Sequence, residues 1–364
     1  MSKNRKIIFY LGSLARGGAE RVVVNLAEYL VKSEYTVTIA TPIQAEVEYN
    51  VPNGVNRILV DLTEEELTKS RIKNLFLRIQ KLRNIWKKEK PDLIVSFAKK
   101  NNFMAIVSAK GLKIPVIAGI VSAAFREYPK ELKWIANILF PMASGVIAQT
   151  PEQRDYFCKR ARKKMTILPN AMNPDFVGAV YEGRREDRIV AVGRVDENKN
   201  HVMLVKAFAK LADKYPEVTV EIFGDGPARE TVEKQIEESK MTGRVIMAGH
   251  QTDIKSKIQK ARIFVLPSKV EGVPNAMIEA MALGLVPVST DFGGGGAHVL
   301  IKDGVDGFMV PVDDVDMMAE KIDAILSNPE MEARMRENAV KIQDRLKPER
   351  VNKQWQDYFE TFLV

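Results

Sequence analysis

The sequence predicts an α/β protein made of two units, each a parallel sheet covered by helices. Short apolar runs alternate with longer segments in which apolar residues recur every three or four positions, as expected for strands that alternate with helices. The alternation begins at Lys6–Leu11 and starts again at Arg188–Val192, after a polar stretch. A chain of 364 residues, 46% apolar and 28% charged, has the size and composition of two soluble domains.

The first unit opens with a buried strand at Lys6–Leu11, because this short apolar run ends at Gly12. A glycine loop follows, and Val22–Leu30 has the apolar spacing of a helix. We expect the remaining strands of this unit at Thr36–Ala40, Leu93–Phe97, Val116–Ile120, Gly145–Gln149 and Met165–Leu168.

The second unit opens with the strand Arg188–Val192 and the loop GRVDENKN. Later in this unit, the turn GDGP joins a strand to a helix. We expect its other strands at Val218–Phe223, Val245–Met247, Ile263–Leu266 and Val286–Ser289. We expect its helices at about Val202–Tyr215, Ala228–Ser239, Thr252–Lys260, Asn275–Leu283 and Asp314–Leu326.

The boundary between the units lies in the polar stretch 170–187, so we assign residues 1–175 to the first domain and 176–348 to the second. The tail, about Glu349–Val364, carries apolar residues at helical spacing. Such a helix would pack on either domain, and we expect it to join the first.

Basic residues are concentrated in one half of the chain. The formal net charge is +8, but residues 1–180 hold 29 Lys and Arg against 16 Asp and Glu, whereas residues 181–364 hold 26 against 31. A basic protein can bind nucleic acid, yet no basic motif interleaved with aromatic residues is present. We therefore expect no nucleic acid and assign the basic half to another anionic partner.

Cysteine content and hydropathy limit the cellular compartments in which the protein is expected. Cys158 is the single cysteine, which excludes a disulfide framework and a cysteine-rich zinc site and fits a reducing compartment. No apolar run approaches the roughly 18–20 residues of a membrane span, and the N-terminal apolar run is too short for a signal peptide. We expect a cytoplasmic protein, and a peripheral position on the inner face of the membrane stays open.

Residues 264–290 carry the clearest chemical pattern. A strand ends at Pro267, a loop presents Glu271 and Gly272, and a helix that begins near Asn275 contains Glu279. Two carboxylates at a strand–helix junction can hold hydroxyl groups, while the free amides of a helix N-terminus can hold phosphate. The alternative for Glu279 is helix capping or exposure, but its neighbours are almost all apolar, and a buried carboxylate needs a partner.

Glu271 and Glu279, with GVPNAMIEAMALG between and after them, resemble the E-x7-E signature of retaining glycosyltransferases of family 4. That resemblance implies the GT-B fold, in which two Rossmann-like domains face each other and a C-terminal helix can cross back to the first. Four other segments resemble family motifs in the family's order: residues 12–30, 193–211, 222–236 and 303–314.

The resemblance implies transfer of a sugar from a nucleotide-sugar donor with retained configuration, and with no metal or other cofactor. Arg194 and Lys199 match the pair that contacts the donor pyrophosphate, where cations stabilise a departing diphosphate. Glu271 matches the contact to the donor sugar, and Glu279 the contact to the ribose hydroxyls. The remaining donor-binding positions are Gly17, Gly18, Gly224, Gly226, His250, Gly272, Val273, Pro274 and Asn275.

Some of these positions have a plain structural alternative. Gly17 and Gly18 would permit close approach of the backbone to phosphate, but they also fit an ordinary turn. Gly224 and Gly226 fit a connection between strand and helix as well as they fit ligand contact. His250 would contribute its backbone, and its imidazole is given no catalytic role.

Two departures from the family pattern are evident. Many members carry a histidine in the N-terminal domain, whereas every histidine here follows residue 200. Within GIVSAAFREY, residues 119–128, the side chains that could act instead are Ser122, Arg126 and Glu127. We choose Arg126 as the catalytic candidate, because it could orient the acceptor or offset phosphate charge. The other departure is GGGGAHV at 293–299, which lacks the family's usual glutamate, so donor-sugar selectivity cannot be carried over.

Residues 69–90 form a basic amphipathic helix with Ile72, Leu75, Phe76 and Trp86 on one face. Such a helix can lie on an anionic membrane or pack as an ordinary domain helix with a solvated basic face. Residues 130–141 and 154–164 add apolar and basic side chains. A saccharide linked to a lipid pyrophosphate would suit this half as the acceptor.

The resulting expectation is a glycosyltransferase of bacterial surface-glycan synthesis that uses a UDP-sugar, the donor of most members of the family. Two alternatives stay open. One is a GT-B-like sugar-nucleotide epimerase, although no clear set of acid and base residues supports it. The other is a non-catalytic, membrane-associated binder of nucleotide-sugars, although the intact charged motifs argue against lost activity.

Overall fold

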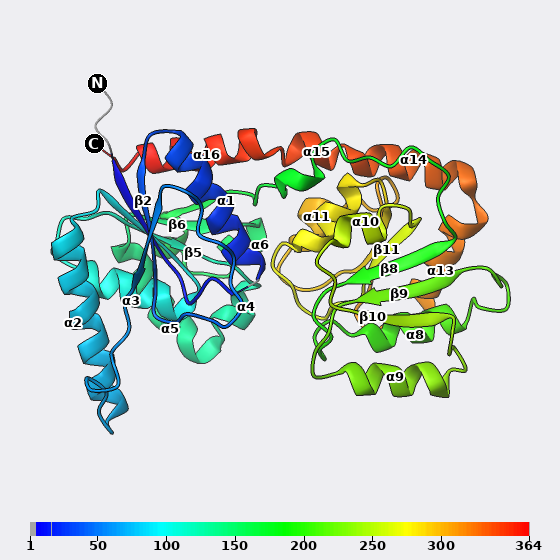
Figure 1. The fold of residues 1–364 in the computed structure, drawn as a ribbon, viewed down its shortest axis with the longest axis horizontal. Helices are drawn as coiled ribbons and strands as arrows, with labels where there is room; N and C mark the ends of the chain where they lie inside the picture. The colour runs from blue at the N-terminus through cyan, green and yellow to red at the C-terminus, as the bar shows by residue number, and fades with distance from the viewer. Residues whose placement is uncertain (1–4, 16, 364) are drawn as a thin grey trace. The chain divides into compact units, whose positions relative to one another are not determined.

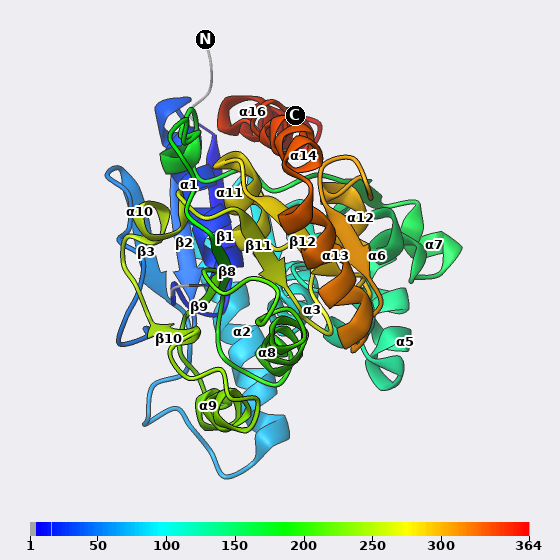
Figure 2. The same ribbon diagram turned by 90° about the vertical axis from the view of Figure 1, so that its right-hand side faces the viewer.

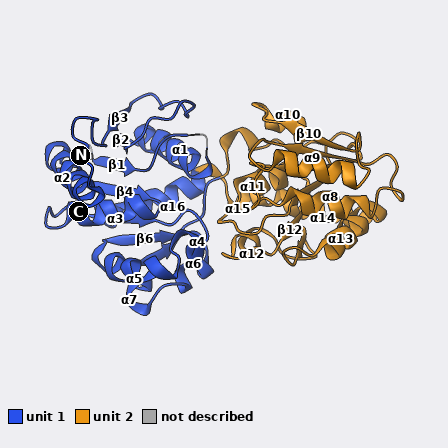
Figure 3. Cartoon of the chain, turned by 90° about the horizontal axis from the view of Figure 1, so that it is seen from below, with its two compact units in different colours: residues 1–171, 349–364 blue, residues 172–348 orange. Residues whose placement is uncertain are grey.

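The computed structural model describes residues 5–15 and 17–363. The chain divides into two compact units, residues 1–171 with 349–364 and residues 172–348 (Figure 3). None of the described helices is long and apolar enough to cross a bilayer.

Unit 1 contains a seven-stranded sheet in which every pairing is parallel, with strand order β3-β2-β1-β4-β5-β6-β7. The central strands are buried on both faces, which explains why they are continuous apolar runs rather than alternating ones. The strands are β1 (Lys6–Tyr10), β2 (Thr36–Thr41), β3 (Val55–Leu59), β4 (Leu93–Phe97), β5 (Val116–Gly119), β6 (Gly145–Ala148) and β7 (Met165–Ile167).

Helices cover both faces of this sheet, as Figure 1 shows. Helix α1 buries an apolar stripe that includes Val23, Leu26 and Leu30. The described helices are α1 (Gly18–Lys32), α2 (Arg71–Glu89), α3 (Lys99–Ala109), α4 (Ala124–Glu127), α5 (Lys130–Leu139), η1 (Phe140–Met142), α6 (Pro151–Asp155), α7 (Lys159–Arg162) and α16 (Pro348–Glu360).

The C-terminal helix α16 packs on unit 1. The indole Nε1 of Trp355 donates to the carbonyl oxygen of Pro169 at 2.9 Å, and the ring of Phe359 lies 6.3 Å from that of Phe9 in β1. Trp355 and Phe359 are buried. The apolar residues that recur at helical spacing in the tail therefore form the face of α16 that packs against the first sheet.

Unit 2 contains a six-stranded parallel sheet with order β10-β9-β8-β11-β12-β13. Its strands are β8 (Arg188–Val192), β9 (Thr219–Phe223), β10 (Val245–Gly249), β11 (Ile263–Leu266), β12 (Val286–Thr290) and β13 (Phe308–Val310). Its helices are η2 (Pro174–Phe176), α8 (His201–Ala209), α9 (Arg229–Glu238), α10 (Ile254–Ile258), α11 (Asn275–Ala282), α12 (Gly296–Leu300), α13 (Val315–Ser327), α14 (Pro329–Val340) and α15 (Ile342–Arg345).

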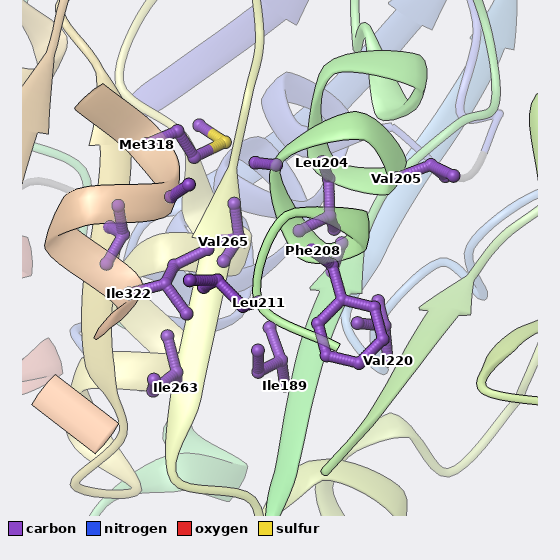
Figure 4. Packing of buried hydrophobic residues seen from close by; sticks show 14 of the residues in the cluster. Ile189, Leu204, Val205, Phe208, Leu211, Val220, Ile263, Val265, Met318 and Ile322 are labelled. Atoms are coloured by element: carbon purple, nitrogen blue, oxygen red, sulfur yellow. The ribbon is translucent and has the colours of Figure 1, made fainter. Parts of the chain in front are cut away.

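The core of unit 2 lies between its sheet and the neighbouring helices α8 and α13 (Figures 1 and 2). Ile189, Val220 and Val265 of the strands pack against Phe208 of α8 and Ile322 of α13, and all are fully buried (Figure 4). Their close packing fixes where the strands end, and therefore where the loops that follow them begin.

In each sheet the strand order reverses next to the strand that comes first in the sequence. The reversal lies between β1 and β4 in unit 1 and between β8 and β11 in unit 2. Ligands of open α/β sheets bind beyond the carboxyl ends of the strands at such reversals. These two edges are therefore where functional residues are expected.

Candidate functional site

The loop after β8 is organised by the carboxylate of Asp196. Its Oδ1 accepts a hydrogen bond from the amide of Lys199 at 2.9 Å, and its Oδ2 lies 2.6 Å from Nη2 of Arg194. Partial burial alone would raise the pKa of Asp196, but the hydrogen bonds from Lys199 and Arg194 outweigh it and lower that pKa. Asp196, which we did not predict from the sequence, thus holds both predicted cations on one loop.

Lys199 reaches across the strand reversal to the loop after β11. Its Nζ lies 2.8 Å from Oε1 of Glu271, and their side chains are 18% and 17% exposed. The two loops are also joined by Asn198, which donates from Nδ2 to the oxygen of Val270 at 2.8 Å and accepts from the amide of Lys269 at 2.7 Å. Residues that are 72 positions apart in sequence therefore form one half-buried, charged site.

Arg194 has a different environment from Lys199. Its side chain is 71% exposed and is held on one side by Asp196. An exposed guanidinium that keeps several donors free of the protein core can bind an anion such as a diphosphate. The structure thus brings Arg194, Lys199 and Glu271 to the same edge, one cation exposed and the other paired with the carboxylate.

Helix α11 places Glu279 inside unit 2, where it is 6% exposed. The helix begins at Asn275, directly after Gly272, Val273 and Pro274, so its first amides follow the loop that carries Glu271. The surroundings of Glu279 exclude the exposed position that was the alternative from sequence.

The glycine run after β12 has a packing role. A Cβ placed on Gly296 would lie 1.7 Å from the carbonyl oxygen of Gly272, so only glycine lets helix α12 approach the loop of Glu271. Gly294 and Gly295 have φ angles of +113° and +77°. At Gly296 the run thus supports the loop that carries Glu271.

Gly224 and Gly226 also pack against backbone. A Cβ on Gly224 would lie 1.9 Å from the carbonyl oxygen of Gly193, and one on Gly226 would lie 2.3 Å from that of Val195. These contacts favour the structural alternative for both glycines, although they stand at the same sheet edge as Lys199. His250 follows β10 at this edge and is exposed.

In unit 1 the predicted glycines stand at the start of helix α1, after β1. Gly17 is the N-cap residue and Gly18 the first helical residue, and the amide of Gly17 donates to the oxygen of Ala15 at 2.6 Å. A Cβ on Gly17 would meet the carboxylate of Glu20 at 2.3 Å. The start of α1 is thus packed closely on its own first turn, beside the strand reversal of the first sheet.

Residues 119–128, the segment expected to replace the family's histidine, contain both exposed and buried side chains. Arg126 is exposed on α4, whereas the Oε1 atom of Glu127 is buried. Oε2 of Glu127 accepts from the amides of Val121 at 3.0 Å and Ser122 at 3.1 Å. Burial raises the pKa of Glu127 to about 7, and the two amides oppose that shift only in part.

Helix α2 is packed into unit 1 at one end and exposed at the other. Leu82 and Trp86 in its C-terminal half are buried, and Nε1 of Trp86 donates to Oγ of Ser108 at 2.8 Å. In its N-terminal half, Ile72 is 82% exposed and Phe76 is 65% exposed. The helix is therefore anchored at one end and exposes apolar side chains at the other.

The basic groups of this helix are partly neutralised. Arg78 pairs with Asp61 at 2.6 Å, and Lys81 pairs with Glu66 at 2.6 Å. Exposed basic side chains at the apolar end are Lys69, Arg71 and Lys73. The charge available to an anionic partner is thus smaller than the sequence suggested.

Comparisons with known proteins follow the division into units. A model described as Glycosyltransferase Family 4 matches residues 16–176, and one described as Glycosyl transferases group 1 matches residues 181–342. A relative from Campylobacter jejuni is 29% identical over 92% of this chain and 92% of its own length. It is named GalNAc-alpha-(1->4)-GalNAc-alpha-(1->3)-diNAcBac-PP-undecaprenol alpha-1,4-N-acetyl-D-galactosaminyltransferase.

A second relative, from Escherichia coli, is 22% identical over 82% of each chain and is named UDP-Gal:alpha-D-GlcNAc-diphosphoundecaprenol alpha-1,3-galactosyltransferase. Among solved structures, HepE from Anabaena in complex with UDP matches with a TM-score of 0.79 and 17% identity, over 98% of this chain and 100% of that one. Sucrose-phosphate synthase from Thermosynechococcus elongatus matches with a TM-score of 0.80 and 19% identity, over 98% of each chain.

The likeness to these structures confirms the predicted GT-B fold, with two Rossmann-like domains. The two family models cover the two units in turn, and the segments that resembled family motifs lie within their combined span, except for the first few residues of the glycine loop. The chain therefore belongs to glycosyltransferase family 4.

Proposed function

We propose that this glycosyltransferase moves a sugar from a UDP-sugar, bound at the β8–β11 edge of unit 2, to a saccharide carried on a lipid diphosphate. The observation that carries the proposal is the 2.8 Å ion pair between Lys199 and Glu271 at the strand reversal, with Arg194 exposed beside it. A diphosphate leaving group develops negative charge, and cations already in place stabilise that charge.

The reaction retains the anomeric configuration in this proposal. The bond from the anomeric carbon to the diphosphate oxygen breaks, and the acceptor oxygen attacks the same face of the sugar. The acceptor proton passes to an oxygen of the departing phosphate. Arg194 and Lys199 hold the diphosphate, Glu271 orients the sugar and Glu279 the ribose, so no protein base is needed and no metal is assigned.

The lipid-linked acceptor is supported by the two relatives named for undecaprenyl diphosphate-linked saccharides. It is also supported by the basic surplus of the first 180 residues and by the exposed apolar end of α2. We propose that unit 1 takes the acceptor on the cytoplasmic face of a bacterial membrane, where α2 contacts anionic lipid. The product would be a bacterial surface glycan or glycoconjugate.

An assay of the purified chain with a panel of nucleotide-sugars and an undecaprenyl diphosphate-linked saccharide tests the proposal. The expected product is extended by one sugar, with the anomeric configuration of the donor when it is read by NMR. A product of inverted configuration would contradict the retaining mechanism. Interconversion of nucleotide-sugars without any acceptor would identify an epimerase instead, and donor binding without turnover would identify a binder.

A further inference from the structure

Glu127 joins two segments at the carboxyl edge of the first sheet. Its carboxylate accepts from the amides of Val121 and Ser122, which follow β5, and lies close to the amide of Lys99, the first residue of α3 after β4. The hydroxyl of Tyr128, which accepts from Nδ2 of Asn102 of α3 at 2.8 Å, also favours the carboxylate form. One side chain thus connects the ends of two neighbouring strands.

The loop held by Glu127 is restrained from its other side. Nε2 of Gln153 in α6 donates to the carbonyl oxygen of Ser122 at 2.9 Å, while Glu127 accepts from the amide of the same residue. Ser122 is therefore held at both of its backbone polar groups. Of these two hydrogen bonds to Ser122, the one accepted by Glu127 is the one that changes when the carboxylate gains a proton.

We propose that Glu127 is a positioning residue for the acceptor: in its ionised form it fixes the loop after β5 at the edge of unit 1 where the acceptor binds. This inference rests on the proposed function for the location of the acceptor. Arg126, which we had chosen from the sequence, is exposed beside it.

The charged groups around Glu127 leave it as the group that titrates near neutrality. Among the described residues no lysine or arginine forms an ion pair with it. Tyr128 has a pKa well above its ordinary value because of burial and because of Glu127 itself. On α6, Arg154 pairs with Asp155 at 2.9 Å, and Glu152 is exposed. A loss of charge at Glu127 therefore weakens its hold on the two amides with no other nearby group replacing it.

The test compares wild type with Glu127→Gln, which keeps the size and one acceptor oxygen but cannot ionise. For wild type, kcat/KM for the lipid-linked acceptor should rise about tenfold from pH 6 to pH 8, as the ionised fraction of a group titrating near 7 does. The variant should be independent of pH and about tenfold below the wild-type value at pH 8. Glu131→Gln, an exposed carboxylate at the start of α5, should keep the wild-type profile.

Hydrogen exchange of the peptide 119–128, corrected for intrinsic exchange, gives a readout that does not need transfer. Protection of the Val121 and Ser122 amides should increase with pH in wild type and stay constant in Glu127→Gln. A kinetic pH dependence that persists in the variant, or exchange that is identical in the two proteins, would overturn the proposal. If no acceptor is used at all, the proposed function fails, while the exchange result still decides the role of Glu127.

Discussion

At the scale of single residues, Glu127 is a carboxyl group that holds its proton to a higher pH in the folded chain than in the unfolded chain. Burial raises its pKa from the ordinary 4.5 to about 7, so the folded chain binds a proton between these values that the unfolded chain has lost. The contribution of Glu127 to the free energy of unfolding is therefore highest at low pH and falls as the pH rises from about 4.5 to about 7.

Glu127→Gln removes this titration. Relative to the variant, wild type should lose about 1.4 kcal/mol of unfolding free energy per pH unit within that window. Urea unfolding of both proteins at pH 5, 6, 7 and 8 checks this, with Glu131→Gln as the matched control that should follow wild type. A difference between wild type and the Gln variant that does not change with pH would show that the carboxyl is ionised throughout.

Glu279 is buried in α11 at 6% exposure, behind the loop of Glu271. If it binds the ribose, Glu279→Ala should weaken UDP binding by roughly ten- to a hundredfold, the usual cost of losing a charged hydrogen-bond partner. Calorimetric titration with UDP measures the affinity, and circular dichroism checks the fold. Glu237→Ala, on the exposed face of α9, should bind as wild type does, and an unchanged affinity of the Glu279 variant would remove it from the donor site.

At the scale of elements, helix α12 can approach the loop that carries Glu271 only because residue 296 is glycine. Gly296→Ala should lower the free energy of unfolding by about 2 kcal/mol, because the added methyl group meets the carbonyl oxygen of Gly272. Gly12→Ala has its nearest neighbouring atom at 3.9 Å and should be tolerated. Equal unfolding midpoints of the two variants in urea would contradict this account of the glycine run.

The exposed end of α2 leads to a membrane prediction. Ile72→Gln combined with Phe76→Gln should lower binding to anionic vesicles at least severalfold without changing stability, since both side chains are exposed. Vesicle flotation with phosphatidylglycerol and with neutral lipid measures this. Ile246→Gln, an exposed apolar residue of unit 2, is the control. Equal flotation of the double variant and wild type would place the membrane contact elsewhere.

The elements that sequence predicted well are those with strong apolar patterns. The central strands β4, β8 and β11 lie at or within one residue of the expected ranges, because burial on both faces requires continuous apolar runs. The strand β3 was not predicted, since its VNRIL has two polar residues at its centre, lies at the edge of the sheet and leaves Leu59 56% exposed. The three-residue strand β13 and the helices α14 and α15 were also not predicted.

The residues of the candidate site were predictable where they belong to family motifs. They were not predictable where their role depends on contacts that form only in the folded chain. The family resemblance indicated Lys199 and Glu271 separately, but their ion pair depends on the order of β8 and β11 in the sheet. Asp196 was not singled out in the sequence, and Glu127 was named there only as one of three candidates of its segment, behind Arg126. Their roles come from the amides that surround them, which only the folded chain brings together.

At the scale of the whole molecule, the two units repeat one topology with different charge. Each sheet is parallel and reverses its order beside its first strand, yet the first 180 residues carry the surplus of lysine and arginine. Under the proposed function, a few placed cations in unit 2 would serve the donor, whereas the basic surface of unit 1 would serve an anionic lipid-linked acceptor. This division of roles is what a transferase with a soluble donor and a membrane-bound acceptor requires.

The most direct test of the account is transfer by Lys199→Ala, measured with the donor and lipid-linked acceptor that wild type uses. The variant should lose about a hundredfold or more in kcat, the cost of removing one preorganised charge from a developing anion. Lys210→Ala removes an exposed lysine at the C-terminal end of α8, paired with Asp316, and should keep wild-type kcat. Wild-type turnover by the Lys199 variant would contradict the claim that the Lys199–Glu271 site carries the reaction.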